Sequence, residues 1–402
     1  MGIKKWIVLF LILGMNCSYA KANKEINMVG MKLEDFLSNH NSDEDVVAIS
    51  AGPKNIYVEN GRHAQFFNFD FTIEGLSDKE LTIRFIKVAV YDAKDRLLTF
   101  RYLNHNAVGT AGIQTIGKSL VQGKEKFDIY NPFYEFPKDL NIHYLRYMFT
   151  FFEKKTGKEF YYGNIVIRPV QYKQKTKLAI PLKGLMAITD GHDYYSHHRR
   201  FEMSVVKLAT DNQFQSNFSR FALDFTLVGK DGNFRKMEEN EKYSNYDFHF
   251  TDIKKFYTHN ADVFSPADGE VVDLVNNLDD LYDRQFDLDK AIKEKRVKDI
   301  AGNYVIIKHN DKEFSHLFHL EKGSINVKIG QKVKRGQKLG RIGFSGTAAV
   351  YSHLHYQLMN GKDFLKDEAV PFQFSNITLI QGVQKKKLKT AIIDTGDLIL
   401  NL

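Results

Sequence analysis

Two histidines separated by a single residue are the feature of this 402-residue chain that most suggests chemistry. They are His353 and His355, which lie in the strand-like segment Ser352-His353-Leu354-His355. On a β-strand, residues two apart point to the same face. The pair would therefore present both imidazoles together, so that one could hold a metal while the other acts on substrate or water.

The spacing by itself is weak evidence, because a strand with two half-exposed histidines gives the same pattern. The sequence before it strengthens the interpretation. Short apolar runs at residues 302–309 and 313–320 precede a glycine-punctuated run at residues 330–343. Alternating strands with glycine at the bends indicate a small, tightly turned β-structure.

The N-terminus predicts export. Two lysines precede an apolar run at residues 6–15, and the small residues Ser18 and Ala20 suit a signal peptidase. This arrangement is typical of a secretory signal peptide over residues 1–20. We therefore expect a protein located in the periplasm or outside the cell. No later segment approaches the ~20 apolar residues of a membrane helix, so we expect no membrane span.

The only cysteine of the chain, Cys17, lies inside that leader. Removal of the leader leaves no thiol, which excludes disulfides and thiolate ligands from the mature protein. Any metal must therefore be held by His, Asp or Glu. The net charge of +8 favours an anionic partner such as cell-wall polymer, but much of the excess is scattered along the chain and we expect no nucleic-acid partner.

The pattern along the chain predicts a mainly β protein. Residues 46–170 alternate apolar and polar positions in short runs broken by turn residues, which predicts an N-terminal antiparallel β-sandwich domain. A second domain is expected at residues 178–372, with an inserted surface helix at residues 274–300, followed by a C-terminal extension at residues 373–402. A polar stretch at residues 229–251 is expected to be a loop.

The segment from residue 264 to residue 358 resembles the LytM-type (M23, lysostaphin-like) metallopeptidases. Five pieces carry the resemblance in order, and together they are far more specific than any one of them. They are the Pro-Ala-Asp-Gly-Glu-Val-Val run that starts at Pro266, the His319-Leu320 strand end, residues 330–337, the Gly-Phe-Ser-Gly of residues 343–346, and residues 352–355. The resemblance implies a LytM-like β-sheet domain with a catalytic Zn²⁺.

The resemblance also implies roles for individual residues. In that family a His, an Asp and the second His of the His-x-His pair bind zinc, and water completes the tetrahedron. Carried over to this chain, Asp224 and His355 become metal ligands, and His319 and His353 become catalytic residues. Three protein ligands with an open fourth position are what a catalytic zinc requires.

The first ligand departs from the family's pattern. The usual His lies four residues before the Asp, and Arg220 occupies that position here. The segment at residues 191–200 offers His197 and His198 instead. If this segment is a strand, neighbours face opposite ways and only one of the two can reach the metal. We favour His198 and keep His197 as the alternative.

The expected function is that of a zinc metalloendopeptidase that hydrolyses the peptide cross-links of bacterial peptidoglycan. One alternative is a catalytically inactive LytM-like protein that binds cell wall or activates an amidase. A second is a hydrolase directed at something other than wall peptide. The glycine-rich strands are also similar to lipoyl and biotinyl carrier domains, but the lysine motif of those domains is missing. The sandwich or the polar stretch could fill the substrate groove and keep the enzyme latent.

Overall fold

The computed structural model describes residues 45–106, 112–236, 253–348 and 351–402. The backbone contacts divide the chain into two units, residues 1–39 and residues 40–402, and every described residue belongs to the second. The predicted leader at residues 1–20 lies outside the described residues, and so does most of the predicted loop at residues 229–251. In the described part of the chain, no helix is long and apolar enough to cross a membrane.

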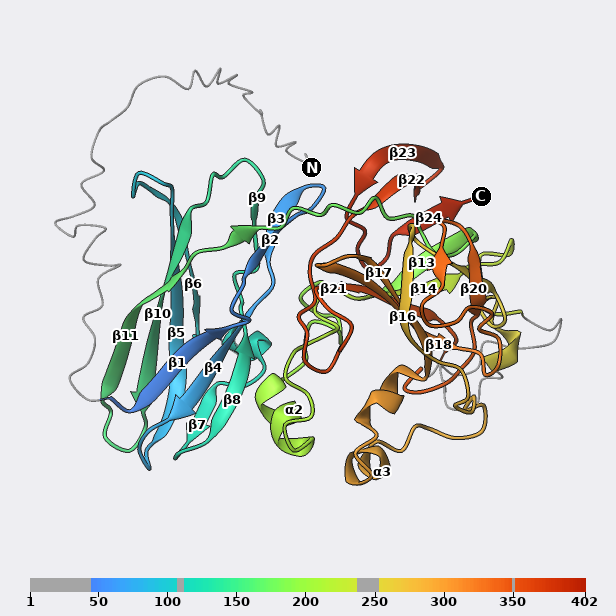
Figure 1. The fold of residues 1–402 in the computed structure, drawn as a ribbon. Helices are drawn as coiled ribbons and strands as arrows, with labels where there is room; N and C mark the ends of the chain where they lie inside the picture. The colour runs from blue at the N-terminus through green and yellow to red at the C-terminus, as the bar shows by residue number, and fades with distance from the viewer. Residues whose placement is uncertain (1–44, 107–111, 237–252, 349–350) are drawn as a thin grey trace, which may run out of the picture. The chain divides into compact units, whose positions relative to one another are not determined.

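The N-terminal half is built of strands that pair antiparallel, except for β12, which pairs parallel to β2. They are β1 (Val47–Gly52), β2 (Tyr57–Asn60), β3 (Ala64–Phe67), β4 (Asp70–Gly75), β5 (Glu80–Tyr91), β6 (Leu97–Asn104), β7 (Leu120–Gln122), β8 (Lys126–Tyr130), β9 (Glu135–Pro137), β10 (Tyr144–Glu153), β11 (Glu159–Ile167) and β12 (Val170–Gln171). One sheet has the order β1-β4-β8, a second has the order β11-β10-β5-β6 with β7 beside β5, and a third has the order β12-β2-β3-β9. Figure 1 shows β5, β10 and β11 running side by side.

One aromatic core joins these sheets. Phe71 on β4 packs edge to face with Tyr147 and Phe149 on β10, at ring-centroid distances of 4.8 and 5.1 Å. All three rings are buried. Two antiparallel sheets that bury their facing side chains against each other form a sandwich. The alternating sequence pattern of residues 46–170 therefore predicted this part of the fold correctly.

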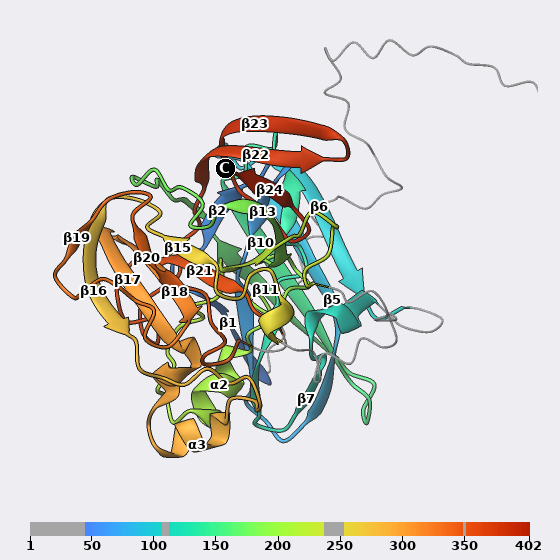
Figure 2. The same cartoon turned by 90° about the vertical axis from the view of Figure 1, so that its right-hand side faces the viewer.

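The second half contributes the remaining strands. They are β13 (Gly184–Asp190), β14 (Leu223–Leu227), β15 (Asp262–Phe264), β16 (Gly269–Val275), β17 (Asn303–Asn310), β18 (Glu313–Leu320), β19 (Lys332–Val333), β20 (Lys338–Arg341), β21 (Leu354–Met359), β22 (Phe374–Gln381), β23 (Gln384–Ala391) and β24 (Leu398–Asn401). Among the described residues, ten of these strands form one antiparallel sheet in the order β19-β16-β17-β18-β21-β14-β13-β24-β22-β23. Figure 2 shows β16, β17 and β18 side by side at one end of it.

Helices are few and short. They are α2 (Met203–Ala209), α3 (Leu288–Lys293) and the 3-10 helices η1 (Gly112–Ile116), η3 (Ile253–Lys255) and η4 (Val297–Ala301). The predicted insertion at residues 274–300 contains α3 and most of η4, so the helical insertion is confirmed. The predicted C-terminal extension adds β22, β23 and β24 to the large sheet, and Phe374 and Ile399 on them are buried in the same core as the central strands.

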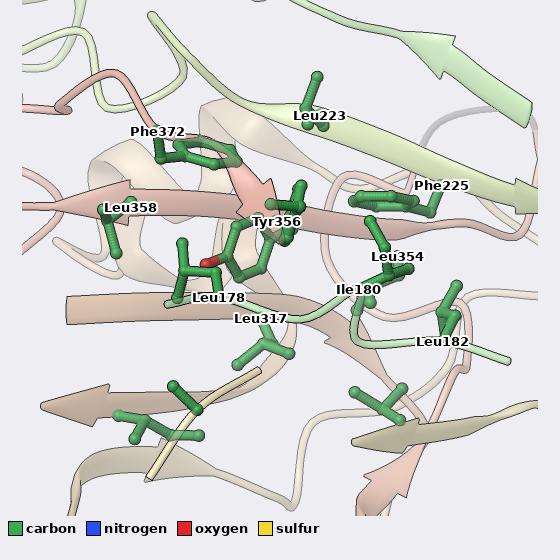
Figure 3. Packing of buried hydrophobic residues seen from close by; sticks show 14 of the residues in the cluster. Leu178, Ile180, Leu182, Leu223, Phe225, Leu317, Leu354, Tyr356, Leu358 and Phe372 are labelled. Carbon is green, nitrogen blue, oxygen red and sulfur yellow. The ribbon is translucent and has the colours of Figure 1, made fainter. Parts of the chain in front are cut away.

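The alternation along β21 separates the core from the other face of the sheet. Leu354, Tyr356 and Leu358 pack in the core, and Figure 3 shows them gathered with Leu317 and Phe225 of the neighbouring strands. Each such buried side chain stabilises the fold by ~1.5–3 kcal/mol relative to exposure. A slip of one residue in register would turn all of these side chains away from the core. The core therefore fixes which residues meet on the opposite face.

A tight turn beside the sheet supplies the first testable prediction. Gly302 has φ 61°, and a Cβ there would lie 2.3–2.5 Å from atoms of Ser345. Gly330 also has a positive φ, 82°, but a Cβ there would meet nothing within 4 Å. We expect Gly302→Ala to lower the free energy of unfolding by ~2–4 kcal/mol and the control Gly330→Ala by only ~1 kcal/mol. Urea unfolding followed by circular dichroism measures both, and equal losses would refute the steric explanation.

Candidate metal centre

Four side chains form a row across the centre of the large sheet. Asp190 on β13 lies opposite Asp224 on β14, Asp224 lies opposite His355 on β21, and His355 lies opposite Phe318 on β18. Directly opposite residues of neighbouring antiparallel strands point to the same face. Strands distant in sequence thus bring these groups together on the side away from the leucine-rich core.

His355 is held from both sides. Its Nδ1 lies 3.1 Å from Oδ1 of Asp224, and its Nε2 lies 2.8 Å from Oε1 of Gln357. An amide oxygen can only accept, so Nε2 carries the proton and Nδ1 presents a lone pair to the carboxylate. Burial lowers the pKa of His355 against the opposing influence of Asp224, which favours this neutral ring. The face of the imidazole stacks on Phe318 with centroids 5.2 Å apart.

His198 reaches the same carboxylate from a turn. Its Nδ1 lies 2.9 Å from the carbonyl oxygen of Gly191, which fixes the proton on Nδ1 in the neutral ring. Its Nε2 is buried, has no hydrogen-bond partner, and lies 3.4 Å from Oδ1 of Asp224. A second lone pair therefore faces the carboxylate without a proton between them.

The separations of two of these pairs of atoms are compatible with a metal site. Nε2 of His198, Nδ1 of His355 and Oδ1 of Asp224 are all acceptors, and the two contacts to Oδ1 measure 3.4 and 3.1 Å. A tetrahedral zinc with bonds of ~2.0–2.1 Å separates its ligand atoms by ~3.3 Å. Buried acceptors that face one another are unfavourable unless a cation lies between them. The residues present therefore fit a divalent metal.

The charge of the carboxylate is maintained by its surroundings. Burial opposes the ionisation of Asp224, but the neighbouring imidazoles, led by His353 and His198, hold the pKa of that carboxyl well below its usual range. A buried anion with neutral imidazoles around it attracts a cation. The electrostatics and the geometry thus point to the same ligand set.

Two further histidines lie in the same site as Asp224. Nδ1 of His319 lies 2.9 Å from the carbonyl oxygen of Ser345, and Nδ1 of His353 lies 3.0 Å from that of Tyr351. Both rings therefore present Nε2 as a lone pair when they are neutral. Nε2 of His353 is 3.5 Å from Oδ2 of Asp224, and the two rings lie 4.9 Å apart. Burial, together with His353 and His355, lowers the pKa of His319 well below its usual value.

The backbone of His319 departs from an ordinary strand. Its φ is 63°, in the left-handed region that a residue with a side chain adopts at a cost of ~1–3 kcal/mol. Leu317 and Leu320 both pack in the core of the sheet, whereas the consecutive residues Phe318 and His319 both line the pocket described below. The unusual conformation therefore turns His319 towards the site, where alternation would have placed it in the core.

His197 lies at the rim of the same site. Its side chain is 69% exposed, and its Nδ1 contacts the carboxylate of Asp190. The ligand atoms of Asp190, His197, His198 and Asp224 all lie within 4.8 Å of one another. Residues 191–200 form turns and contain no strand, so the premise that only one of the two adjacent histidines can reach the site is wrong. The two histidines differ instead in burial, because His198 is only 1% exposed.

Arg220 stands where the family's pattern has the first ligand, but it has a different environment. Its Nη1 lies 3.0 Å from Oδ2 of Asp70, in the N-terminal sandwich. The same atom is 3.4 Å from the side-chain oxygen of Asn68. The guanidinium is thus engaged by the sandwich and is absent from the pocket lining.

A pocket of about 490 Å³ opens over these groups. Its described lining includes all five of the predicted histidines and Asp224. Apolar side chains line the rest, among them Phe201, Val206, Phe214, Phe218 and Ile292. Polar reactive groups therefore lie at one end of a mostly apolar cavity, as in small-molecule and peptide sites.

The sequence interpretation missed three residues of this site. Gln357 was detectable, because it lies two residues beyond His355 on the same strand face. Asp190 and Phe318 carried no sequence signal, since only the pairing of β13 and β18 with their neighbours brings them into the row.

Comparison with protein families identifies part of the chain. Residues 251–367 match the sequence profile of peptidase family M23. This segment includes His319, His353 and His355 but neither Asp224 nor His198. The site described above is therefore completed by two residues that precede the matched segment.

Curated relatives match a part of the chain. Peptidoglycan DD-endopeptidase ShyA of Vibrio cholerae serotype O1 is 37% identical over 98 residues, which is 24% of this chain and 21% of that protein. Peptidoglycan DD-endopeptidase ShyB of the same organism is 44% identical over 59 residues, which is 15% of this chain and 13% of that protein. The matches thus span about a fifth or less of the length of these relatives.

Among solved structures, Csd3 of Helicobacter pylori covers 82% of this chain and 70% of its own, with 12% identity and a TM-score of 0.24. A zinc-containing peptidase from Vibrio cholerae covers 62% of this chain and 85% of its own, with 16% identity and a TM-score of 0.20. Likenesses of this strength carry no argument about the arrangement or activity of this chain.

The contact between Gln357 and His355 generates a prediction about metal affinity. Gln357→Leu removes the acceptor that keeps the proton on Nε2, so Nδ1 is no longer fixed as the free lone pair. We expect the dissociation constant for Zn²⁺ to rise ~10–100-fold, as is usual when a partner of a ligating His is lost. Competition with a chromophoric chelator measures it. The control Gln384→Leu, on the exposed strand β23, should bind as the parent does, and unchanged affinity in Gln357→Leu would contradict this role.

Proposed function

We propose that this chain, which carries a domain of peptidase family M23, is a zinc metalloendopeptidase that cuts the peptide cross-links of bacterial peptidoglycan. The observation that carries the proposal is the convergence of two unprotonated ring nitrogens, from His198 and His355, on Oδ1 of Asp224 at 3.4 and 3.1 Å. Two relatives that match part of this chain are named peptidoglycan DD-endopeptidases, which supports wall peptide as the substrate. The leader-like N-terminus supports a site of action in the periplasm or outside the cell.

The proposed metal ligands are Nε2 of His198, a carboxylate oxygen of Asp224 and Nδ1 of His355. Zinc bound by this set would acidify a water molecule and polarise the scissile carbonyl group. Gly191 and Gln357 fix the tautomers of the two histidines through their other ring nitrogens. His197 is left as a residue of the rim, paired with Asp190.

His319 and His353 act on protons and charge in this proposal. Each donates from Nδ1 to a backbone carbonyl oxygen, so each neutral ring leaves Nε2 without a proton, and both residues line the pocket. A neutral imidazole so oriented accepts a proton from the attacking water and returns it to the leaving amine. In its protonated form the same ring donates to the oxygen on which negative charge develops. The two rings are close enough, 4.9 Å between centroids, to serve one reacting group.

The pocket supports a peptide as the substrate. An extended peptide carries one carbonyl to the reactive end of the cavity and buries short aliphatic side chains along its apolar wall. Phe214 and Phe218 supply part of this wall. The wall offers few charged partners, which favours the small, largely uncharged residues around a peptide cross-link.

The alternative of an inactive cell-wall binding protein or amidase activator predicts a degraded site. Instead the described residues retain a complete set of three acceptors, and both proton-transfer histidines are oriented by backbone hydrogen bonds. A binding protein gains nothing from a left-handed His319, whose conformation costs stability. These features favour an active hydrolase.

Metal content tests the ligand assignment. The full chain without its leader should contain one zinc per molecule by mass spectrometry of the metal, and His198→Ala should contain almost none. His197→Ala is the matched control, because it changes the adjacent residue of the same turn, and it should keep the zinc. A parent without stoichiometric zinc would refute the proposed enzymatic function. Zinc loss in His197→Ala alone would show that His197, and not His198, is the metal ligand.

Hydrolysis of purified sacculi tests the reaction. We expect the parent to convert cross-linked muropeptides to monomers, as measured by chromatography of the digest. His353→Ala should retain zinc and lose ~10²–10⁴-fold in rate, because it removes a proton-transfer group but no ligand. If the parent binds sacculi without any loss of cross-links, and instead accelerates an added amidase, the activator alternative replaces the enzymatic one.

A further inference from the structure

The residue that completes the proposed metal site is carried by a segment without regular structure. Residues 191–200 link the end of β13 at Asp190 to the start of α2 at Met203, and they form only turns and bends. No sheet ladder fixes the position of such a segment. Its position depends on side-chain contacts, and a useful metal ligand must be held within ~0.5 Å of its place.

We propose that the N-terminal sandwich positions this turn, and with it the ligand His198, through the buried carboxylate of Asp70. The inference rests on the proposed function, because it takes His198 as a metal ligand. Asp70 is a positioning residue that touches neither metal nor substrate. In this proposal the sandwich supports the metal site. The sequence alone had suggested a different role, in which the sandwich fills the substrate groove and keeps the enzyme latent.

The contacts of Asp70 carry the argument. Its Oδ1 lies 2.5 Å from Nη1 of Arg199, and its Oδ2 lies 3.0 Å from Nη1 of Arg220. All three residues are buried, with 6%, 1% and 4% of their surfaces exposed. One buried carboxylate is therefore shared by two buried guanidinium groups. Removing one member of such a buried set leaves uncompensated charge and is strongly destabilising.

These two arginines lie beside the two ligands that precede the M23 segment. Arg199 follows His198 directly, and Arg220 lies four residues before Asp224. A single side chain of the sandwich is therefore bonded to both ligand-bearing segments. It sets the distance between them, on which the 3.4 Å separation of Nε2 of His198 from Oδ1 of Asp224 depends.

Further bonds from the sandwich hold the same turn. The carbonyl oxygen of Phe69 accepts from Nη2 of Arg199 at 2.6 Å, and the hydroxyl of Tyr130 donates to the carbonyl oxygen of Arg200 at 3.0 Å. The planar guanidinium of Arg199 thus donates to two acceptors at once. They are the carboxylate of Asp70, on β4, and the carbonyl oxygen of Phe69, the residue before it. Such a fork fixes orientation as well as distance.

The pocket itself gives no sign of occlusion by the sandwich. Its described lining residues all fall between His197 and His355, so none of the described residues of the sandwich contributes to it. The sandwich contacts the turn at Arg199 and Arg200, and neither residue lines the cavity. Support of the ligand, and not blockage of the groove, is what these contacts provide.

The test compares two full-length variants, each of which removes one charged side chain of the sandwich that forms two ion pairs. Asp70→Asn removes the charge that holds Arg199 and Arg220. Arg62→Gln is the matched control, because Arg62 forms an ion pair with Asp397 at 2.8 Å and makes no hydrogen bond or ion pair with His198. The readouts are the dissociation constant for Co²⁺, the visible spectrum of the Co²⁺ form, and the thermal unfolding midpoint of the metal-free protein.

We expect both variants to unfold at a lower temperature, but only Asp70→Asn to bind Co²⁺ ~10–100-fold more weakly and with an altered spectrum. Asp70→Glu, which keeps the charge, should recover part of the affinity. If Asp70→Asn does not fold, Arg199→Lys serves instead, because it keeps a positive charge near Asp70 and loses the fork. Parent-like affinity and spectrum in the folded variant, or an equal loss in Arg62→Gln, would overturn the inference.

The same measurements separate this inference from the proposed function. A parent that binds Co²⁺ tightly but releases no peptide from sacculi fails as an endopeptidase, while the comparison of Asp70→Asn with Arg62→Gln still decides the positioning role. An active parent with a parent-like Asp70→Asn variant fails only the positioning role. A parent that binds no metal overturns both.

Discussion

The carboxylate of Asp224 is the group around which this molecule is organised. It is buried, it is ionised, and the nearest atoms of His198 and His355 meet it as acceptors with no proton between them. A protein interior tolerates such an arrangement only when a cation resolves it. The hydrogen bonds that Gly191 and Gln357 accept make this geometry specific, because they leave one ring nitrogen of each histidine without a proton.

The sheet supplies half of that geometry. Asp224 and His355 meet because they lie directly opposite each other on β14 and β21. The leucines and aromatic residues between them bury the other face and fix the register. Reactive groups placed on a packed sheet are positioned with little freedom, since movement of one would require repacking of the core. Conformational strain accompanies this arrangement at His319, whose backbone is left-handed.

The position of His198 depends on a turn, and a turn outside the sheet is held in place by contacts with other parts of the protein. His198 lies on such a segment, and buried charges link it to the N-terminal sandwich through Arg199 and Asp70. The match to peptidase family M23 covers residues 251–367, so it includes three histidines of the site and omits this support. An M23 segment considered alone would therefore give an incomplete description of the site in this chain.

The sequence by itself determined the mainly β class, and it predicted the sandwich and a helical segment within residues 274–300, because alternation and turn residues are local patterns. The expectation that His319, His353, His355 and Asp224 share one site came from the resemblance to the M23 family. Only the tertiary structure decided between the environments of His197 and His198, engaged Arg220 with Asp70, and brought Asp190 and Phe318 into the row. Burial and cross-strand pairing join residues distant in sequence, and no local pattern encodes which partners will meet.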